Sequence, residues 1–424
     1  MSRLRQKKPS VPLGAALLAL TLAGIALGAR WVTSAAGRAK EAYRQSLARQ
    51  TAAAAPGVSD AAPAPQPEPP QPAQEEPVLQ VDAEQTSIEP PAQLTLMALG
   101  DNLIHNCVYW SAELPGGGYD FTPFYEDIRP VAEGYDLACI NQETILVKDA
   151  YNIGNYPYFG TPIQMADDLA AVGFDIVTHA TNHSYDKGET GILDSASYWR
   201  ENHPEVTVLG IHDSEEDAAV LRVVEKNGVR LALLNYTYGL NYGSPAKSWM
   251  VDEFSSYERV KTDLQRAAEA ADFTVVFAHW GEEGQFSPNS YQKTWAQFLA
   301  DNGADVIIGA HPHVLQPLEH LTAGDGRDVP VFYSLGNFLS HQTDWHNMLG
   351  GMASLTFEKD AQGVRISQCE LKPTVNVILY SATNEWYFYR PMLLEDYTPE
   401  LAAQHRFAEC SVENLTALYG QITG

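Results

Sequence analysis

The stretch DVIIGAHPHVLQPLE, residues 305 to 319, places two histidines on either side of a proline, directly after a short apolar run. The run is typical of a buried strand, and Pro312 favours extended backbone at His311. In an extended chain alternate residues point the same way, with Cα atoms roughly 6.6 Å apart. This spacing suits ligands of neighbouring metal ions, which lie about 3.5–4 Å apart in two-metal sites. A polar loop after a strand is the alternative, because an isolated His-Pro-His pattern is unspecific.

The same design, an apolar run that ends in a polar or glycine-rich turn, recurs along the chain. The runs are LTLMALGDN, DLACINQET, DIVTHATNH, VRLALLNYTYG, FTVVFAHWGEEG, DVIIGAHPH and VFYSLGNF. Between them, helices are predicted over Thr161–Gly173, with Thr161 as N-cap and Pro162 at the first helical position, and over Ser255–Ala271 and Ser287–Gly303. Strands that alternate with helices indicate an α/β domain, in which functional residues gather beyond the carboxyl ends of the strands.

Residues able to bind metal fall at those strand ends. They are Asp101, Glu143, Asn182, His183, His279, His311 and His313. Carboxylates, an amide and imidazoles are ligand types for Zn, Mn or Fe. Each residue alone has an ordinary structural explanation, such as a cap, a turn or a packed histidine. Their recurrence at one topological position predicts a metal site.

Composition narrows the class of protein. The chain has 424 residues, 45% of them hydrophobic, which is enough for a large core. Its net charge of −26 makes nucleic acid an unfavourable partner. The cysteines Cys107, Cys139, Cys369 and Cys410 are scattered, so their spacing requires no disulfide, and we expect Cys139 to be a buried free thiol.

The first 92 residues differ from the rest. A basic head over residues 1–10 precedes an uncharged apolar run, and we predict a transmembrane anchor over 11–30 with a cytoplasmic N-terminus. A cleaved signal peptide followed by secretion is the alternative. Residues 31–92 are rich in Ala, Pro and Gln and predict a disordered tether. The main domain, predicted over 93–349, would then lie outside the cell, with β-segments and a helical edge of the same domain over 350–424.

Six motifs in order carry a family resemblance. They are G-D, N-x-E, T-N-H-x-x-D-x-G, H-W-G-x-E, G-A-H-P-H and Y-S-L-G-N-F, between Leu94 and Leu339. In this respect the chain resembles the CapA family of poly-γ-glutamate capsule biosynthesis proteins, within the calcineurin-like metallophosphoesterase superfamily. The resemblance implies a four-layer α/β/β/α sandwich around two divalent ions of Mn, Fe or Zn.

The resemblance also implies a role for each site residue. Asp101 and His313 would hold one metal ion, and Asn182, His279 and His311 the second, with Glu143 bridging the two. His183 would act as general acid with Asp186 orienting its ring, and Glu283 would contact substrate or support the ligands. The superfamily usually opens with D-x-H, whereas this chain has Asp101-Asn102-Leu103. The first ion therefore lacks an imidazole, and a site with one ion is an alternative.

Two functions of different class follow. The first is an exported metal-dependent hydrolase that acts on a cell-envelope polymer or a small phosphoester, at a phosphoester or amide bond. The second is a non-catalytic component that binds, anchors or exports such a polymer with other capsule-synthesis membrane proteins. The His183–Asp186 pair favours the hydrolase, because a purely structural metal site needs no general acid. Two loops rich in Tyr, Asn and Gly, residues 151–162 and 235–245, are either binding loops over the site or packed surface turns.

Overall fold

The computed structural model describes residues 91–380 and 387–424. The predicted anchor and almost all of the predicted tether lie outside these residues. In the part of the chain that the structure describes, no helix is both long and apolar enough to cross a bilayer.

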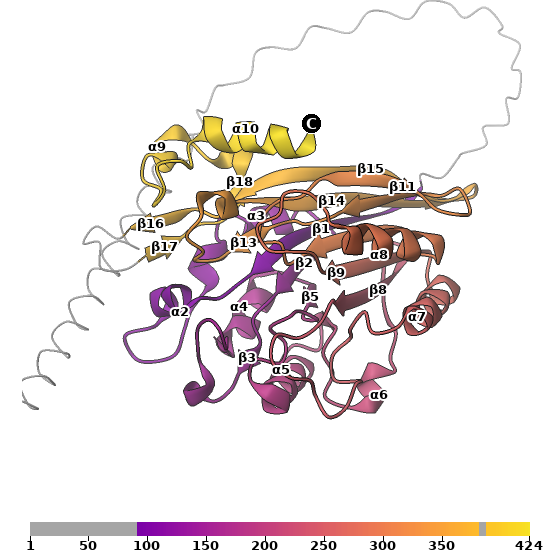
Figure 1. Cartoon of the computed structure of the whole chain (residues 1–424), viewed down its shortest axis with the longest axis horizontal. Helices are drawn as coiled ribbons and strands as arrows, with labels where there is room; N and C mark the ends of the chain where they lie inside the picture. Colours follow the sequence, from indigo (N-terminus) through magenta and orange to yellow (C-terminus); the bar gives the residue numbers. More distant parts are fainter. Residues whose placement is uncertain (1–90, 381–386) are drawn as a thin grey trace, which may run out of the picture.

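Two mixed sheets form the centre of the molecule (Figure 1). Within the described residues the larger sheet has eight strands, in the order β18-β15-β14-β1-β2-β5-β6 with β13 beside β1. The smaller sheet has six, in the order β11-β12-β10-β9-β8-β7. The strands of the larger sheet are β1 (Ala92–Asn102), β2 (Leu137–Gln142), β5 (Ile176–Thr178), β6 (Thr207–Leu209), β13 (Asn337–Leu339), β14 (Leu349–Asp360), β15 (Gly363–Val375) and β18 (Met392–Leu393). Those of the smaller sheet are β7 (Arg222–Lys226), β8 (Val229–Thr237), β9 (Phe273–His279), β10 (Val306–Ala310), β11 (Leu318–Thr322) and β12 (Asp328–Phe332).

Helices and short turns surround the sheets. The α-helices are α2 (Asn106–Ala112), α3 (Arg129–Ala132), α4 (Gln164–Val172), α5 (Gly188–Asn202), α6 (Glu215–Ala218), α7 (Tyr257–Ala270), α8 (Ser290–Asp301), α9 (Pro399–Ala402) and α10 (Val412–Thr423). Single 3₁₀ turns are η1 (Thr122–Tyr125), η2 (Ala150–Asn152), η3 (Trp345–Met348) and η4 (Leu394–Asp396). Two strand pairs stand apart, β3 (Leu146–Val147) with β4 (Thr161–Pro162) and β16 (Ile378–Tyr380) with β17 (Tyr387–Tyr389).

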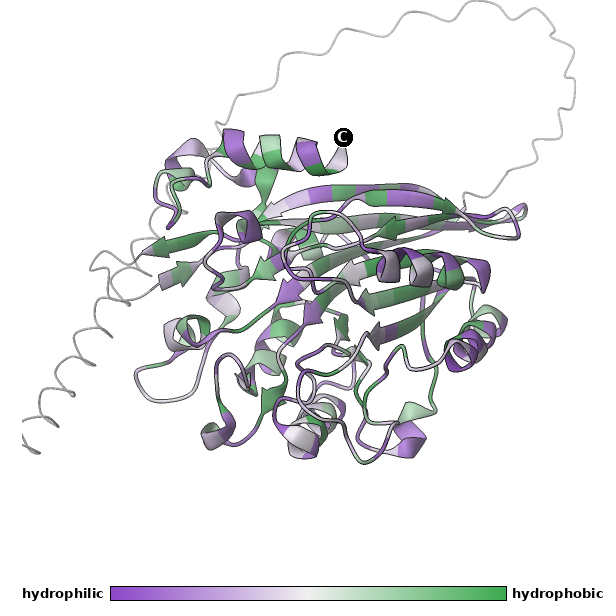
Figure 2. Cartoon of the chain, viewed as in Figure 1, coloured by the Kyte–Doolittle hydropathy of each residue, from purple (hydrophilic) through white to green (hydrophobic). Residues whose placement is uncertain are grey.

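The two-residue period of β9 explains how the layers stack. Val275 and Phe277 belong to the large core shared with the other sheet, whereas Val276 and Ala278 join a second core under α7 and α8. Helix α7 buries Val260 and Leu264 on one face, and Figure 2 shows its outer side as hydrophilic. The smaller sheet is therefore packed between helices and the larger sheet. The α/β class predicted from the sequence is confirmed.

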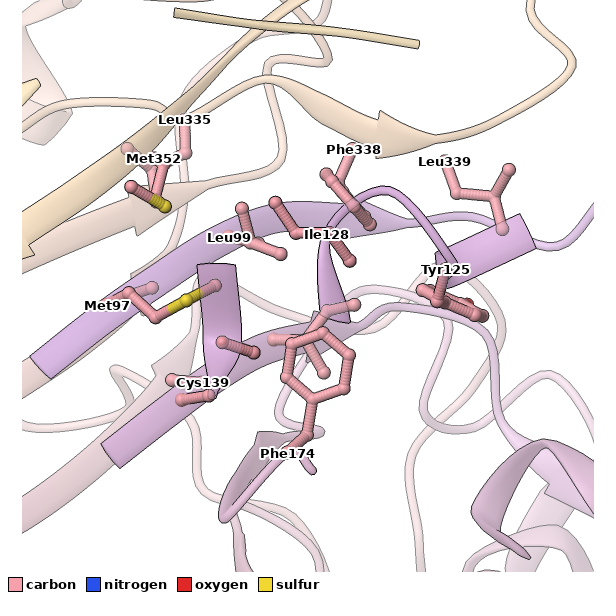
Figure 3. Packing of buried hydrophobic residues seen from close by; sticks show 14 of the residues in the cluster. Met97, Leu99, Tyr125, Ile128, Cys139, Phe174, Leu335, Phe338, Leu339 and Met352 are labelled. Atoms are coloured by element: carbon pink, nitrogen blue, oxygen red, sulfur yellow. The ribbon is translucent and has the colours of Figure 1, made fainter. Parts of the chain in front are cut away.

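The core between the sheets reaches the ends of the central strands. Figure 3 shows side chains of β1, β2, β13 and β14 packed together with neighbouring loops; those labelled are Met97, Leu99, Tyr125, Ile128, Cys139, Phe174, Leu335, Phe338, Leu339 and Met352. Cys139 is buried and free, as predicted, and burial raises the pKa of its thiol. All four cysteines lie in the described residues, and all are free.

The three predicted helices are present as α4, α7 and α8, with one correction at the start of α4. The sequence predicts Thr161 as N-cap and Pro162 as first helical residue, but these two residues form β4 and the helix begins at Gln164. The reason is a tertiary contact. Thr161 pairs with Leu146 of β3, and its hydroxyl bonds that of Thr144 at 2.6 Å, so it cannot cap the helix.

Candidate metal centre

Parallel strands from both sheets deliver the candidate ligands to one edge of the molecule. Asp101 is the penultimate residue of β1, and Glu143 directly follows β2, its parallel neighbour. His279 ends β9, and His311 directly follows β10, which pairs in parallel with β9. Because β1 also packs on β10, the carboxyl ends of the two sheets meet here.

Glu143 lies at the middle of this group and is fully buried. Its Oε1 is 3.5 Å from His313 Nε2 and 3.8 Å from His279 Nε2. Neither carboxylate oxygen accepts a hydrogen bond from any described residue. Burial raises the pKa of Glu143 well above its ordinary value, although the charge of His313 opposes this shift. Burying a carboxylate without a hydrogen-bond donor costs free energy, and a bound cation would compensate for the missing donors.

Asp101 and His313 form one side of the group. Asp101 Oδ2 lies 3.0 Å from His313 Nδ1, and Asp101 Oδ1 accepts a 2.7 Å bond from Asn141 Nδ2. Burial alone would lower the pKa of His313, but the carboxylates of Glu143 and Asp101 raise it to about 10. In the protein without a metal ion, His313 thus carries the positive charge that a metal would supply.

Asn182 and His279 form the other side. Asn182 Oδ1 lies 2.7 Å from His279 Nε2. Burial and the neighbouring imidazoles of His311 and His313 hold the pKa of His279 well below its ordinary value, so its ring is neutral. A neutral imidazole beside an amide oxygen is a donor pair that suits Zn, Mn or Fe.

His311 contradicts the predicted extended geometry of the His-Pro-His stretch. Its φ is 98° and that of His313 is 59°, so both adopt backbone conformations that L-residues rarely occupy. Tertiary contacts hold the turn, since the His311 N–H faces the Asp101 carboxylate at 3.3 Å and the Pro312 carbonyl accepts a bond from Gly284 N–H. Such strain costs on the order of 1–3 kcal/mol per residue and clusters at functional sites.

The turn presents the His311 ring to the other ligands. It lies 4.9 Å from the His279 ring and 4.7 Å from the Tyr238 ring, centroid to centroid. Its Nδ1 is buried and has no hydrogen-bond partner among the described residues. Glu143, His311 and His313 can each direct one ligand atom so that the three atoms lie within 4.8 Å of one another. Buried ligand atoms that converge in this way, some of them without a hydrogen-bond partner among the described residues, fit a divalent cation.

His183 and Asp186 stand beside the ligands as a bonded pair. His183 Nδ1 is 2.7 Å from Asp186 Oδ2, which also accepts the Phe159 backbone N–H at 2.8 Å. Both residues are buried, and Phe159 packs edge-on to the His183 ring. The pair leaves His183 Nε2, which faces Asn241 Nδ2 at 3.4 Å, as the nitrogen available for proton transfer.

Glu283 is the one predicted site residue that the structure leaves exposed. It lies in the loop after β9, which the Gly284–Pro312 backbone bond ties to the His-Pro-His turn. Burial and the negative charges of Glu283 and Glu143 raise the pKa of Tyr238 to about 12. Glu283 thus influences Tyr238 through its charge, and no hydrogen bond among the described residues joins Glu283 to the ligands.

Three amides next to the ligands were not predicted to have a role. Asn141 connects the two sides, since its Nδ2 contacts Asp101 and lies 3.5 Å from His279 Nδ1. Asn337 Oδ1 lies 3.1 Å from His313 Nδ1. Asn241 Nδ2 lies 3.4 Å from His183 Nε2. Asn141 and Asn337 occur inside the quoted motifs N-x-E and Y-S-L-G-N-F, and this was the available signal.

The two loops whose role the sequence does not decide, residues 151–162 and 235–245, meet beside His183. The rings of Tyr158 and Tyr242 lie 4.3 Å apart, and Asn241 N–H donates to the Asn182 carbonyl. Tyr151 and Tyr156 beside them are largely exposed. The parts of the two loops around Tyr158 and around Asn241 and Tyr242 therefore form a rim beside His183.

Comparison with known proteins identifies the family of the chain. A family model described as bacterial capsule synthesis protein PGA_cap matches residues 95–342, which include every predicted site residue. The PGA biosynthesis protein CapA of Bacillus subtilis (strain 168) is 31% identical over 177 residues, which cover 41% of this chain and 44% of that protein. The capsule biosynthesis protein CapA of Bacillus anthracis is 28% identical over 259 residues, covering 59% of this chain and 60% of that protein. The chain thus spans less than two thirds of the length of either relative.

Solved structures give a more distant likeness. The calcineurin-like phosphoesterase YfkN from Bacillus subtilis aligns with 14% identity and a TM-score of 0.38, over 78% of this chain and 100% of that chain. A putative 5'-nucleotidase from Staphylococcus aureus aligns with 16% identity and a TM-score of 0.42, over 66% and 54%. These scores support no inference about chemistry. The family model, in contrast, matches more than half of the 424 residues, and the chain therefore belongs to the bacterial capsule synthesis protein PGA_cap family.

Proposed function

We propose that this chain is a metal-dependent hydrolase of the CapA type that acts on a cell-envelope polymer, at a phosphoester or amide bond. The observation that carries the proposal is the buried Glu143 carboxylate, which lacks any described hydrogen bond and faces His279 and His313. Two helix-covered sheets that meet at this edge are consistent with the four-layer architecture of metallophosphoesterases.

The distances support two ligand groups with Glu143 between them. Asp101 and His313 would hold one ion of Mn, Fe or Zn, and Asn182, His279 and His311 the second. A divalent cation bound here supplies Lewis-acid polarisation of the scissile group and an activated water. Asn141 would orient both groups through its contacts with Asp101 and His279, in the manner of the outer-shell partners of metal ligands.

His183 is the residue we assign to proton transfer. The 2.7 Å contact with Asp186 fixes its ring and favours the proton on Nδ1, so that a protonated Nε2 would deliver its proton to the leaving group. Phe159 on one side limits water access to the ring. Asn241 contacts the ring from the rim and is placed to bind a substrate oxygen beside it.

A non-catalytic role in binding or anchoring a capsule polymer is the second candidate. It is favoured by the position after Asp101, where the superfamily's imidazole is missing. The side chain of Asn102 turns away to Gln142 at 2.6 Å, and Leu103 is buried. An ion on this side would have fewer protein ligands and would be held more weakly, so that a site with one ion is the corresponding alternative.

The envelope location is part of the proposal. An anchor over residues 11–30 and a tether up to residue 92 would place the metal centre outside the membrane, where a capsule polymer is assembled. Protease added to intact cells should then remove the domain after Ala92, whereas a cytoplasmic domain would be protected.

Activity of the metal-loaded full-length chain tests the proposal. We expect hydrolysis of bis-p-nitrophenyl phosphate or of γ-glutamyl-p-nitroanilide. His183→Asn and Asp186→Asn should lower kcat by about 10²–10⁴-fold, the usual contribution of a general acid, with metal content unchanged. His203→Gln is the matched control, because this partly buried histidine also pairs with an aspartate, Asp167, and belongs to none of the proposed ligands. Hydrolysis that persists in the His183 variant would exclude its role, and inactive wild-type protein that still binds polymer would favour the second candidate.

A further inference from the structure

Arg406 forms an unusual cluster near the metal centre. Its Nη1 donates to His341 Nε2 at 2.8 Å, and its guanidinium lies 5.1 Å from the Tyr387 ring centroid and 5.0 Å from that of Phe407. Among the described residues no carboxylate lies within 4 Å of it, although acidic residues outnumber basic ones 53 to 27 in the whole chain. A half-buried arginine without an acidic partner is therefore held in place by a neutral acceptor and two rings.

His341 positions this arginine without supplying a negative charge, and no carboxylate of the described residues does so. Burial, followed by the nearby Arg406 charge, lowers the pKa of His341 to about 4, so the ring is neutral at physiological pH. Because a guanidinium can only donate, Nε2 of this neutral ring is the acceptor, and Nδ1 carries the proton and donates to the Tyr389 hydroxyl at 2.6 Å. Most of the five guanidinium donors therefore have no acceptor among the described residues.

His341 of the cluster follows β13, the parallel neighbour of the strand β1 that carries Asp101. Strand β1 pairs in parallel with β13, with Asp101 opposite Asn337. Four residues further along these segments are His105 and His341, and His341 N–H donates to His105 Nδ1 at 3.2 Å. Because the chain leaves the strands after Asn102 and Leu339, His105 lies nearer to Asp101, and His341 nearer to Asn337, than the roughly 13 Å that four extended residues would span.

A line of rings joins the cluster to the proposed general acid. His105 packs edge-on to Phe159 at 5.3 Å, and Phe159 packs edge-on to His183 at 4.8 Å. Arg406, His341 and His105 are each partly exposed. The guanidinium is thus linked to His183 through the side chains of His341, His105 and Phe159.

We infer that Arg406 and His341 form an anion-binding subsite for a carboxylate or phosphate group of the substrate, linked to the metal centre through His105 and Phe159. A planar guanidinium binds either group through paired hydrogen bonds. The subsite gives an acidic substrate a local cation on a protein whose net charge of −26 repels it. The inference rests on the proposed function only in assuming that another part of the same substrate reacts at the metal centre.

The test measures binding, so that it does not depend on hydrolysis. Calorimetric titration of the full-length chain, with chelator and again with Mn²⁺, uses three probes: a γ-linked glutamate trimer, the same trimer with amidated carboxyl groups, and inorganic tripolyphosphate. Arg406→Gln removes the charge, and Arg406→Lys keeps the charge without the planar donor set. Arg365→Gln is the control, because this exposed arginine pairs with Asp360 in the β14–β15 turn.

Arg406→Gln should weaken binding of the acidic trimer, of tripolyphosphate or of both by about tenfold or more, with and without metal. Arg406→Lys should weaken it less, and neither variant should alter binding of the amidated trimer. Loss for the trimer alone identifies a carboxylate ligand, and loss for tripolyphosphate alone a phosphate. Wild-type affinity for both anions in the Gln variant, or no binding by wild-type protein, would overturn the inference. If the Gln variant does not fold, unchanged affinity in the folded Lys variant would overturn it equally.

Discussion

The unpartnered carboxylate of Glu143 should make the metal-free protein less stable than its neutral variant. Glu143→Gln keeps the shape of the side chain and removes its charge. A buried polar group without a hydrogen bond costs about 1–3 kcal/mol. The attraction of His313 offsets part of this cost, because its Nε2 lies 3.5 Å from Glu143 Oε1. His313 retains Asp101 at 3.0 Å in the variant.

We therefore expect Glu143→Gln to raise the free energy of unfolding of the chelator-treated protein by about 1 kcal/mol, the lower end of that range. This corresponds to roughly 2–4 °C in Tm for a domain of a few hundred residues. With metal bound, the wild type should instead have the higher free energy of unfolding of the two proteins. A ligand at about 100 times its Kd stabilises the native state by about 2.7 kcal/mol, and the variant should gain much less because it lacks the central ligand.

Urea unfolding followed by circular dichroism, with chelator and with Mn²⁺, measures both effects. Asp305→Asn is the matched control, since Asp305 is a carboxylate with partners. It contacts Arg327 at 2.9 Å and accepts the Thr274 N–H at 2.8 Å, so its loss should destabilise the protein with or without metal. If Glu143→Gln is the less stable protein in chelator, Glu143 is a structural group and the reasoning is wrong.

Three further predictions concern His311, His212 and Gly309. His311→Gly should exceed His311→Ala in free energy of unfolding of the metal-free protein by roughly 1 kcal/mol in urea titrations, because glycine tolerates the φ of 98°; equal stability would show that the turn relaxes. Burial alone would lower the pKa of His212, but contacts with Asp217 and Asp252 raise it to about 9, so its stabilising contribution is complete below about 6.5 and is lost as the pH rises through about 9. The difference in free energy of unfolding between wild type and His212→Gln should accordingly shrink over that interval, and a constant difference would contradict the assignment. Gly309→Ala should abolish metal binding or folding, measured by metal content and thermal melting, because a methyl group there would collide with the Tyr333 carbonyl; a normal variant would show that the strand can move.

The strand-end ligands could be predicted because they follow from periodicity and topology. An apolar run marks each buried strand, and parallel strands bring their carboxyl ends together, so Asp101, Glu143, His279 and His311 converge without knowledge of any contact. These four residues lie together because their strands run in the same direction, and the alternation of strands and helices in the sequence predicts that direction.

Features decided by contacts distant in sequence could not be predicted. The rule for residues before proline favours extended backbone at His311, but the Asp101 carboxylate and the Gly284–Pro312 bond impose a positive φ. Thr161 is a good N-cap by type, yet Thr144 occupies its hydroxyl.

Arg406 illustrates the same limit at longer range. It occurs in a C-terminal segment without a ligand-like pattern, and only the tertiary structure brings it to His341. Asn141 and Asn337 are amides inside the motifs, and amides after strands usually make turns, so their contacts with the ligands became evident only in the structure. The predicted anchor over 11–30 lies outside the described residues and stays a prediction.

Metal content tests the central claim most directly. The full-length chain, purified without a histidine tag, would be analysed by elemental mass spectrometry beside a variant that carries both His311→Ala and His313→Ala. Two equivalents of Mn, Fe or Zn in the wild type, lost in the variant, are the predicted result, and one equivalent would favour the site with one ion. No bound metal after incubation with Mn²⁺ or Zn²⁺ would contradict the account, and the converging histidines would then be structural.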